Sequence, residues 1–448
     1  MGCIITLRHE ATKEITDTVK VYVTALGCKL NQSEAESWAR GLAAAGFEIV
    51  DDPASADLSI VNTCTVTHVA AGKSRQRVRQ CARANPQAQV VVSGCYAEIS
   101  PAQATRLPGV CWVAGTADKE RLIETICASF GLAPPAGPVA TQRPPGAHTR
   151  AFVKIQDGCD NACTYCIVRI ARGPQRSRPS QDILDEIMAR QAEGYQEVVL
   201  TGVHIGAYGR DRGGTLAGLV RQVLERTGFP RLRLSSIEPW DLTSELLALW
   251  ENARLCRHLH LPLQSGCDAT LRRMNRRYTT AQYSELLAAA RRTIPDLAVT
   301  TDVIVGFPGE NQFEFKASAE FVERMAFARL HVFPFSARQG TAAAGMPARV
   351  SARVKKERAA RMADIGRRCA VAFQSNFLGR TMSVLWETRR SGRWNGLTDN
   401  YIRVWADSSN PLSNRICPAR LTEVIQGGMR GELAVTSVPR AAAASPSE

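Results

Sequence analysis

Residues 151–166 read AFVKIQDGCDNACTYC, an apolar, strand-like run followed at once by three closely spaced cysteines. Cys159, Cys163 and Cys166 have the spacing C-x3-C-x2-C. Three thiolates this close together can bind three irons of a 4Fe–4S cluster and leave the fourth iron open. S-adenosylmethionine can chelate that iron, and one electron from the cluster then breaks its S–C5′ bond to give a 5′-deoxyadenosyl radical. The stretch therefore predicts a strand that ends at a site of radical chemistry.

A structural zinc site is the alternative for these cysteines. Zinc usually takes a fourth Cys or His and a C-x2-C pairing, and no suitable partner pair lies nearby in the sequence. The spacing favours the iron–sulfur interpretation. Tyr165, between the last two cysteines, is a candidate to pack on the adenine of S-adenosylmethionine.

The strand before the cysteines opens a series of alternating strands and helices. Its further apolar runs are EVVLTG (197–202), RLRLSS (231–236), HLHLPL (258–263), LAVTTDVIVG (297–306) and ARLHVFPF (328–335), with helical segments between them. Six parallel strands of this kind predict an open, partial (β/α)6 barrel related to the eight-stranded TIM barrel. Chemistry in such barrels collects at the C-terminal ends of the strands, which is where the cysteines fall.

An earlier α/β region carries a second set of cysteines. Cys28, Cys64 and Cys95 each follow a predicted parallel strand, in VYVTALGC, LSIVNTC and VVVSGC. Neighbouring parallel strands deliver their C-terminal ends to one edge of a sheet, so three thiols could converge there without a local motif. From periodicity alone, three separately buried cysteines explain the pattern equally well; the flanking Gly27 and Gly94 favour a close-packed site.

Composition shifts divide the chain into parts. We expect an N-terminal α/β domain at 19–132, a linker rich in proline and glycine at 133–150, and the partial barrel with a basic helical connector at 151–375. Five short strand-like runs, TMSVLWE (381–387), WNGLT (394–398), YIRVWA (401–406), RLTEVI (420–425) and ELAVTSV (432–438), predict a small β-barrel over 376–438. The tail 439–448 is expected to be disordered.

Charge and cysteine content narrow the function. The 448 residues carry a formal net charge of +14, which favours a polyanionic partner, nucleic acid before membrane. We find no signal peptide and no apolar run long enough to span a membrane, so the sequence reads as cytoplasmic. Fourteen cysteines in such a chain favour metal or redox chemistry over disulfides.

Several longer motifs together resemble one family. The stretches VNTCTVT, GCYAE, DGCDNACTYC, LTGVHIGAYG, HLPLQSG and TDVIVGFPGE are similar to the radical-SAM methylthiotransferases, over about residues 20–438. Lys29 after Cys28, the VNTCTVT stretch and TGVHIG most resemble the branch that modifies N6-threonylcarbamoyladenosine in tRNA. One departure is Arg169, because the family commonly has a proline shortly after the third cysteine of the radical cluster.

The resemblance implies two 4Fe–4S clusters, one held by Cys28, Cys64 and Cys95 and one by Cys159, Cys163 and Cys166. It implies that threonylcarbamoyladenosine at position 37, in the anticodon loop of tRNA, gains a 2-methylthio group, with S-adenosylmethionine and an unidentified electron donor as partners. The small barrel would be a TRAM-like RNA-binding module. Isopentenyladenosine and a ribosomal-protein aspartate are alternative substrates within the family, and a non-catalytic zinc and RNA-binding protein is the alternative of another class.

Polar residues at the predicted strand ends are candidates for S-adenosylmethionine contacts, with barrel-rim stability as the alternative role. Besides Tyr165 they are Thr201, Gly202, Ser236, Glu238 and Gln264. Basic and aromatic residues are candidates for RNA contacts, since phosphate contacts supply much of the affinity. They are Lys73, Arg75, Arg77, Arg79 and Arg83, Arg272 to Arg277, Arg353, Lys355, Lys356 and Arg358, and Arg393, Trp394, Tyr401 and Arg403.

Overall fold

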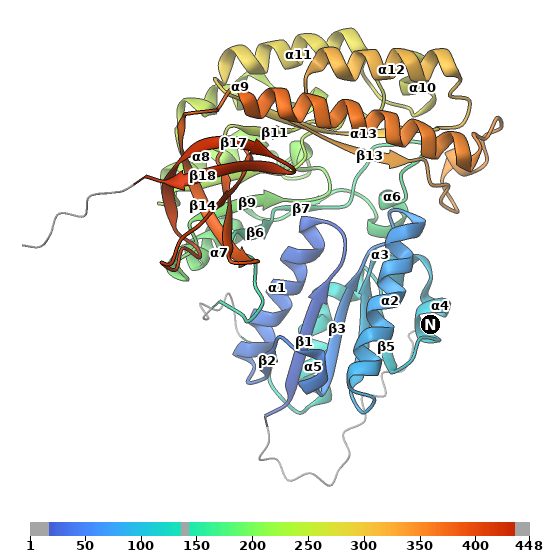
Figure 1. Cartoon of the computed structure of the whole chain (residues 1–448). Coiled ribbons are helices and arrows are strands. Elements are labelled where there is room, and N and C mark those ends of the chain that lie inside the picture. Colours follow the sequence, from blue (N-terminus) through green and yellow to red (C-terminus); the bar gives the residue numbers. More distant parts are fainter. Residues whose placement is uncertain (1–17, 136–142, 435–448) are drawn as a thin grey trace, which may run out of the picture. The chain divides into compact units, whose positions relative to one another are not determined.

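The computed structural model describes residues 18–135 and 143–434, and it divides into two compact units, one up to Ala370 and one from Val371 onward. Figure 1 colours the elements along the chain, from blue to red. The expected linker 133–150 is described only in part. The expected disordered tail 439–448 lies outside the described residues.

The first unit begins with a five-stranded, fully parallel sheet in the order β2-β1-β3-β4-β5. The predicted strands are β1 (Lys20–Ala25), β3 (Leu58–Thr63) and β4 (Gln89–Gly94). The structure adds two strands that the sequence did not predict, β2 (Glu48–Val50) and β5 (Val110–Ala114), one at each edge.

Helices cover both faces of this sheet, drawn in blue in Figure 1. The helices are α1 (Lys29–Ala44), α2 (His68–Ala84), α3 (Cys95–Ile99), α4 (Pro101–Thr105) and α5 (Leu122–Ser129). Alternate residues of the buried strands face opposite ways: Ile60 packs with α1 and α5, whereas Val61 packs with α2. Both faces of β3 and β4 are therefore buried.

Two parallel sheets then form the partial barrel, as predicted. One has the order β10-β9-β6, with β6 (Ala151–Lys154), β9 (Glu197–Thr201) and β10 (Arg231–Leu234). The other has the order β11-β12-β13, with β11 (His258–His260), β12 (Ala298–Val305) and β13 (Arg329–Pro334). Single bridges, Leu232 to Leu255 and Ser236 to His260, join the two sheets, so they curve as one open barrel.

The barrel strands are covered on the outside by helices that share one apolar core. These helices are α7 (Ser180–Ala192), α8 (Leu216–Arg226), α9 (Ser244–Ala248), α10 (Asp268–Arg273), α11 (Thr280–Thr293), α12 (Gln312–Met325) and the long α13 (Ala352–Ser375). Capping boxes fix where two of them begin, Thr279 with Gln282 and Asn311 with Glu314.

The second unit is a closed barrel in the order β14-β15-β16-β18-β17, which confirms the predicted small β-barrel. Its strands are β14 (Thr381–Arg390), β15 (Arg393–Thr398), β16 (Arg403–Ala406), β17 (Ile416–Ile425) and β18 (Gly428–Leu433). The last strand begins earlier in the chain than the predicted run at 432–438, because the hairpin turn falls at Gln426–Gly427. Residues 435–438 of that run lie outside the described residues. Buried Trp386 lies in the core of this barrel.

The first sheet of the partial barrel contains a fully buried ion pair. Arg233 on β10 donates its Nε–H to Glu197 on β9 over 2.6 Å. Burial alone would raise the pKa of Glu197, but the charge and hydrogen bonds of Arg233 outweigh it and lower that pKa to about 2. The pair therefore stabilises the fold while Glu197 is ionised.

We expect this pair to make folding sensitive to acid. Its contribution is complete above the ordinary glutamate pKa of 4.5 and is lost as the pH falls toward about 2, a loss of about 3 kcal/mol. Urea unfolding at a series of pH values should show the free energy of unfolding falling across this window. A double variant, Glu197→Leu with Arg233→Met, should have a shallower slope. Equal slopes in the two proteins would show that the pair does not contribute.

Candidate functional site

The first three cysteines converge at one edge of the N-terminal sheet. Cys28 precedes α1, Cys64 follows β3, and Cys95 begins α3 after β4. Strand pairing brings the three ends together, because Ala25 is opposite Asn62 and Asn62 is opposite Ser93. The three thiols are close enough to influence one another electrostatically. The three cysteines therefore converge at one place and are not buried at three separate places.

Two glycines allow the thiols to approach. Gly27 and Gly94 each directly precede a cysteine, and both have φ of +95°. A Cβ on Gly27 would lie 2.8 Å from the sulfur of Cys64, and a Cβ on Gly94 would lie 2.4 Å from the carbonyl oxygen of Thr63. Only glycine fits such a backbone at this distance. The chain thus forms a tight cradle around three free thiols, which is a donor set that fits an iron–sulfur cluster.

We expect Gly94→Ala to lower iron content selectively. The added Cβ must displace Thr63, which precedes Cys64, so the three sulfurs would no longer converge. Iron analysis after anaerobic reconstitution should give about four irons per chain where the wild type gives about eight. The matched control is Gly131→Ala, which also has a positive φ, of +69°, but has no atom within 4 Å of the added Cβ. A variant at Gly94 with the full iron content would contradict the expectation.

The other three cysteines lie on a loop that its own backbone and the next helices hold in place. Cys159 N–H donates to the carbonyl of Gly173 over 3.1 Å, and Cys166 N–H donates to the carbonyl of Cys163 over 3.1 Å. Thr164 donates through its backbone N–H to Met274 over 3.1 Å and through its hydroxyl to Arg273 over 2.9 Å. Burial raises the pKa of Cys166 to about 12, so cluster binding there would release a proton.

A buried His–Asp pair contacts the first cysteine of this loop. His204 Nδ1 lies 3.8 Å from the sulfur of Cys159, and its Nε2 lies 2.5 Å from Oδ2 of Asp241. Burial alone would lower the pKa of His204, but hydrogen bonds with Asp241 and Cys159 raise it to about 9. Arg210 also pairs with Asp241. Both His204 and Asp241 are buried, so the imidazole is held in a fixed orientation toward the sulfur.

An arginine contacts the second cysteine. Arg276 Nη1 lies 3.6 Å from the sulfur of Cys163 and 3.1 Å from Oε1 of Glu238. The guanidinium also lies over the ring of Trp240, 4.8 Å from its centroid. One cation therefore connects a cysteine of the loop with a carboxylate at the end of a barrel strand.

Arg172 connects the two cysteine sets. It ends α6 (Val168–Arg172), the short helix that follows Cys166, and it is buried. Its guanidinium donates to Asn31 over 2.6 Å, to Glu34 over 3.0 Å and to Asp157 over 2.8 Å. Lys119 and Lys154 also pair with Glu34. Burial alone would lower the pKa of Arg172, but attraction to Glu34, to Asp157 and to the thiolate forms of Cys95 and Cys28 outweighs it and keeps that pKa well above its usual value.

The predicted S-adenosylmethionine contacts lie in different surroundings. Tyr165 packs edge-on against Phe307, with ring centroids 6.5 Å apart. Thr201 ends β9 and is buried, and Gly202 follows it. Ser236 forms the bridge to His260, and Gln264, at φ +63°, bridges to Val303. Glu238 is bound by Arg276, which the sequence did not predict.

The residues expected to contact RNA include both buried and exposed side chains. Arg276 and Arg358 are buried against carboxylates, Arg358 with Glu310 at 2.7 Å, and Trp394 is buried in the core of the small barrel. These three were expected at the RNA surface, and the structure places them inside. Exposed members of the same set include Lys73, Arg79, Arg83, Arg353, Lys356 and Arg393.

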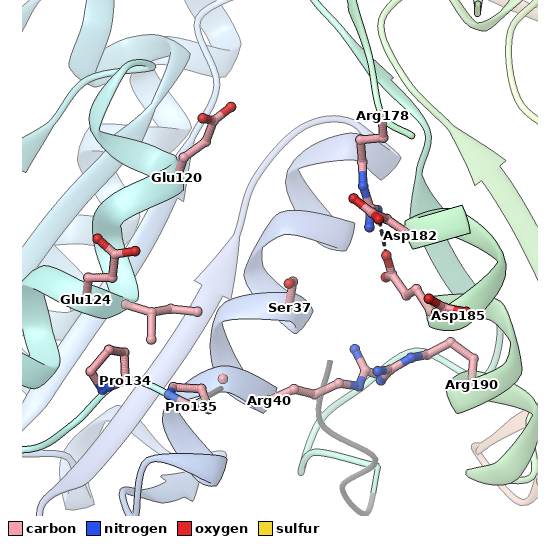
Figure 2. Close-up of a pocket in the computed structure, with 13 residues that line it drawn as sticks. Ser37, Arg40, Glu120, Glu124, Pro134, Pro135, Arg178, Asp182, Asp185 and Arg190 are labelled. Atoms are coloured by element: carbon pink, nitrogen blue, oxygen red, sulfur yellow. Dashed lines mark hydrogen bonds and ion pairs between the residues drawn. The ribbon is translucent and has the colours of Figure 1, made fainter. Parts of the chain in front are cut away.

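A pocket of about 630 Å³ lies away from both cysteine sets. Figure 2 shows Arg40 of α1 in the middle, Glu120 and Glu124 on one side of it, and Arg178, Asp182, Asp185 and Arg190 on the other. Its described lining residues include none of the six cysteines. Most of its charged groups are acidic, so it is unsuited to phosphate and we assign it no part in the chemistry.

The chain is similar to known families and proteins over most of its length. Residues 153–322 match the family model described as "Radical SAM superfamily", and residues 20–115 match the one described as "Uncharacterized protein family UPF0004". The threonylcarbamoyladenosine tRNA methylthiotransferase MtaB of Bacillus subtilis is 36% identical over 415 residues, which cover 88% of this chain and 92% of that protein. The protein of the same name from Thermotoga maritima is 37% identical over 377 residues, covering 82% and 86%.

A relative of different specificity is also similar. The tRNA-2-methylthio-N(6)-dimethylallyladenosine synthase of Syntrophotalea carbinolica is 32% identical over 432 residues, covering 92% of this chain and 99% of that protein. Among solved structures, the radical S-adenosylmethionine methyltransferase TsrM of Kitasatospora setae matches with a TM-score of 0.54 at 17% identity, over 71% of this chain and 74% of that one. That likeness supports the fold alone.

In the described part of the chain, no helix combines the length and apolar character needed to cross a membrane. The identity to the curated relatives extends over most of both chains, and the two matched domains are the two that carry the cysteine sets. The chain therefore belongs to the radical-SAM methylthiotransferases, enzymes that use S-adenosylmethionine and 4Fe–4S clusters to transfer a sulfur-containing group.

Proposed function

We propose that this chain converts N6-threonylcarbamoyladenosine at position 37 of tRNA to its 2-methylthio derivative. The observation that carries the proposal is the pair of three-cysteine sets joined through Arg172. Support for the nucleoside comes from the relatives named for threonylcarbamoyladenosine, at 36% and 37% identity.

In this proposal, Cys159, Cys163 and Cys166 hold the cluster that binds S-adenosylmethionine, and Cys28, Cys64 and Cys95 hold the second cluster. With both clusters and S-adenosylmethionine bound, the two sites would supply an alkyl radical and a methylated sulfur. The reacting C2–H of adenosine has no acidic proton and no leaving group, so acid–base or nucleophilic catalysis would not break that bond. Two adjacent sites, one for the radical and one for the sulfur, suit such a reaction.

The chain's own residues then have positioning roles. His204 and Arg276 contact the sulfurs of Cys159 and Cys163 and fix their orientation. Tyr165, Thr201, Gly202, Ser236 and Gln264 remain our candidates for S-adenosylmethionine contacts. Glu238 is a candidate through Arg276, which holds its carboxylate at the end of the first barrel sheet.

The anticodon loop is the proposed target within tRNA, because its bases can be unstacked and turned into a protein site. The exposed basic residues of α2 and α13 would bind its phosphates, and the closed barrel would add Arg393 and Arg403. An unidentified electron donor would reduce the radical cluster. The proposed place of action is the cytoplasm, where tRNA is modified.

Nucleoside mass spectrometry tests the proposal. The chain is expressed in a host whose tRNA carries both threonylcarbamoyladenosine and isopentenyladenosine without their methylthio derivatives. We expect the methylthio derivative of threonylcarbamoyladenosine to appear, and not to appear with the Cys163→Ala chain. Methylthio-isopentenyladenosine in its place would favour the second candidate, which the dimethylallyladenosine synthases at 32% and 36% identity support. Unchanged tRNA in a host where the protein is loaded with iron would refute both.

A further inference from the structure

Three polar side chains form a connected cluster on the strands of the second barrel sheet. His260 ends β11, Asp302 lies in β12, and His331 lies in β13 directly opposite Asp302. His260 Nε2 is 3.3 Å from Oδ2 of Asp302, and His331 Nδ1 is 3.1 Å from Oδ1. The two imidazole rings stack, with centroids 5.6 Å apart. None of these residues has a part in the cysteine chemistry described above.

Strand alternation shows which way the cluster faces. Neighbouring residues of a strand point to opposite faces. Leu259, Val303 and Val332 pack on the outer side, in the core shared with the helices. Leu330 also faces α13, and its Cβ is so close that a Cβ added to Gly366 would lie only 2.8 Å away. His260, Asp302 and His331 alternate with these residues, so they point inward, into the lumen of the partial barrel.

The same inward rows lead to the radical-cluster loop. Ile304 follows Asp302 two residues along β12, and Phe335 lies beyond β13 in register with the row of His331. Both pack in the small apolar cluster that contains Tyr165, the residue between Cys163 and Cys166. Phe333, between His331 and Phe335, is 41% exposed. The polar cluster and the radical-cluster loop therefore line one continuous face.

The hydrogen bonds leave one nitrogen available. Each imidazole meets a different oxygen of Asp302, and the other nitrogen of His260 is 2.9 Å from the hydroxyl of Thr300. Within the described residues, the structure gives no partner for Nε2 of His331, whose side chain is 37% exposed. Burial would raise the pKa of Asp302, but its bonds to the two histidines outweigh this and hold that pKa well below its usual value. The charged carboxylate thus orients His331.

A metal ion is the other chemistry that two histidines and an aspartate can bind. The candidate ligand atoms all lie within 4.8 Å of one another. The two histidines meet separate oxygens of Asp302 rather than a common point. This pattern is that of a hydrogen-bonded chain with one outward-facing end.

We propose that His331, oriented by Asp302 and His260, is the specificity-determining residue that binds the polar substituent on N6 of the substrate adenosine. This inference rests on the proposed function. Nδ1–H of His331 faces the carboxylate of Asp302, so Nε2 accepts a hydrogen bond from the hydroxyl or a ureido N–H of a threonylcarbamoyl substituent. Phe333, two residues further along the same row, offers a ring of the kind on which unstacked bases stack.

The same cluster would disfavour a hydrocarbon substituent. A dimethylallyl group cannot pair with His331, so its entry would desolvate the histidine and leave it without a partner. A site that hydrogen-bonds its substrate strongly rejects an analogue that lacks the hydrogen-bonding group. An apolar pocket rejects an analogue with an added hydroxyl less strongly. Discrimination in this family member would thus come from a polar cluster within its barrel.

The experiment uses RNA hairpins of the anticodon stem-loop that carry adenosine, isopentenyladenosine or threonylcarbamoyladenosine at position 37. Binding to the reconstituted enzyme without S-adenosylmethionine is measured by fluorescence anisotropy, and methylthiolation in its presence gives kcat/KM. For His331→Leu we expect the preference for threonylcarbamoyladenosine over adenosine to fall about twofold to tenfold, the effect of one hydrogen bond between neutral groups. His331→Gln, whose side-chain carbonyl keeps an acceptor, should retain part of the preference.

Two further readouts separate the possible failures. The exposed neighbour Arg329→Ala should keep both the wild-type preference and the wild-type rate of 5′-deoxyadenosine formation. An unchanged preference in His331→Leu would overturn this inference alone. A wild type that modifies only the isopentenyladenosine hairpin would overturn the proposed function. One equivalent of a metal other than iron, present in the wild type and lost in His331→Leu, would replace the inference with a metal site.

Discussion

Replacing Cys163 by alanine should abolish formation of 5′-deoxyadenosine and lower the iron content by about four per chain. Cys163 supplies one of three thiols on a loop whose backbone is already fixed, so alanine removes a ligand without disturbing the fold. Two remaining thiols cannot hold three irons. The measurements are iron analysis, the visible spectrum of the reconstituted protein, and chromatography of the S-adenosylmethionine products.

The matched control for this variant is Cys267→Ala. Cys267 also lies in the partial barrel and is partly buried, but it belongs to neither cysteine set. It should keep about eight irons per chain and form 5′-deoxyadenosine at the wild-type rate. A Cys163→Ala protein that still bound the full iron and cleaved S-adenosylmethionine would refute the assignment of this loop.

Arg172→Met should destabilise the first unit by about 3–5 kcal/mol, the cost of leaving buried charges without their partner. Methionine fills much of the same volume but leaves Glu34 and Asp157 with less compensation, and it removes the donor to Asn31. Chemical unfolding followed by circular dichroism would show this as a lower midpoint. We also expect poorer loading of the cluster at Cys28, because Asn31 contacts that thiol at 3.8 Å.

Arg169→Met is the control, since Arg169 lies on the same short helix with its side chain exposed. Its effect should stay within about 0.5 kcal/mol, as for most surface substitutions. Arg172→Lys should fall between the two variants, because an ammonium keeps the charge but cannot reproduce the planar fork of a guanidinium. Equal stabilities of the Arg172→Met and Arg169→Met proteins would show that the buried network contributes little.

The sequence predicted those parts of the site that follow from strand order. Parallel strands must end at a common edge, so Cys28, Cys64 and Cys95 could be placed together before the structure was known. The edge strand β2 was missed because three residues are too few for a periodicity to be recognised. The last described strand begins at Gly428 and not at 432, because the turn before it falls at Gln426–Gly427.

Pairings between distant residues could not be predicted in the same way. Arg276 is 38 residues from Glu238, and Arg172 is 138 residues from Glu34, and no local spacing signals either contact. Asp302 and His331 did carry a signal, as ionisable residues inside largely apolar strands. The sequence alone does not show which residues of each strand point into the barrel, so this signal could not be assigned to the inner face. Arg169, which was unexpected in the sequence, turned out to face solvent on α6.

The closed barrel of the second unit has a consequence for how it can meet another molecule. In the described part of that unit, β14 pairs with both β15 and β17, and β16 pairs with both β15 and β18. A sheet without a free edge cannot recruit an added strand from another chain, so it is protected against that route to aggregation. Any partner must be held by side chains and loops instead. Such contacts can be changed one residue at a time without altering the sheet.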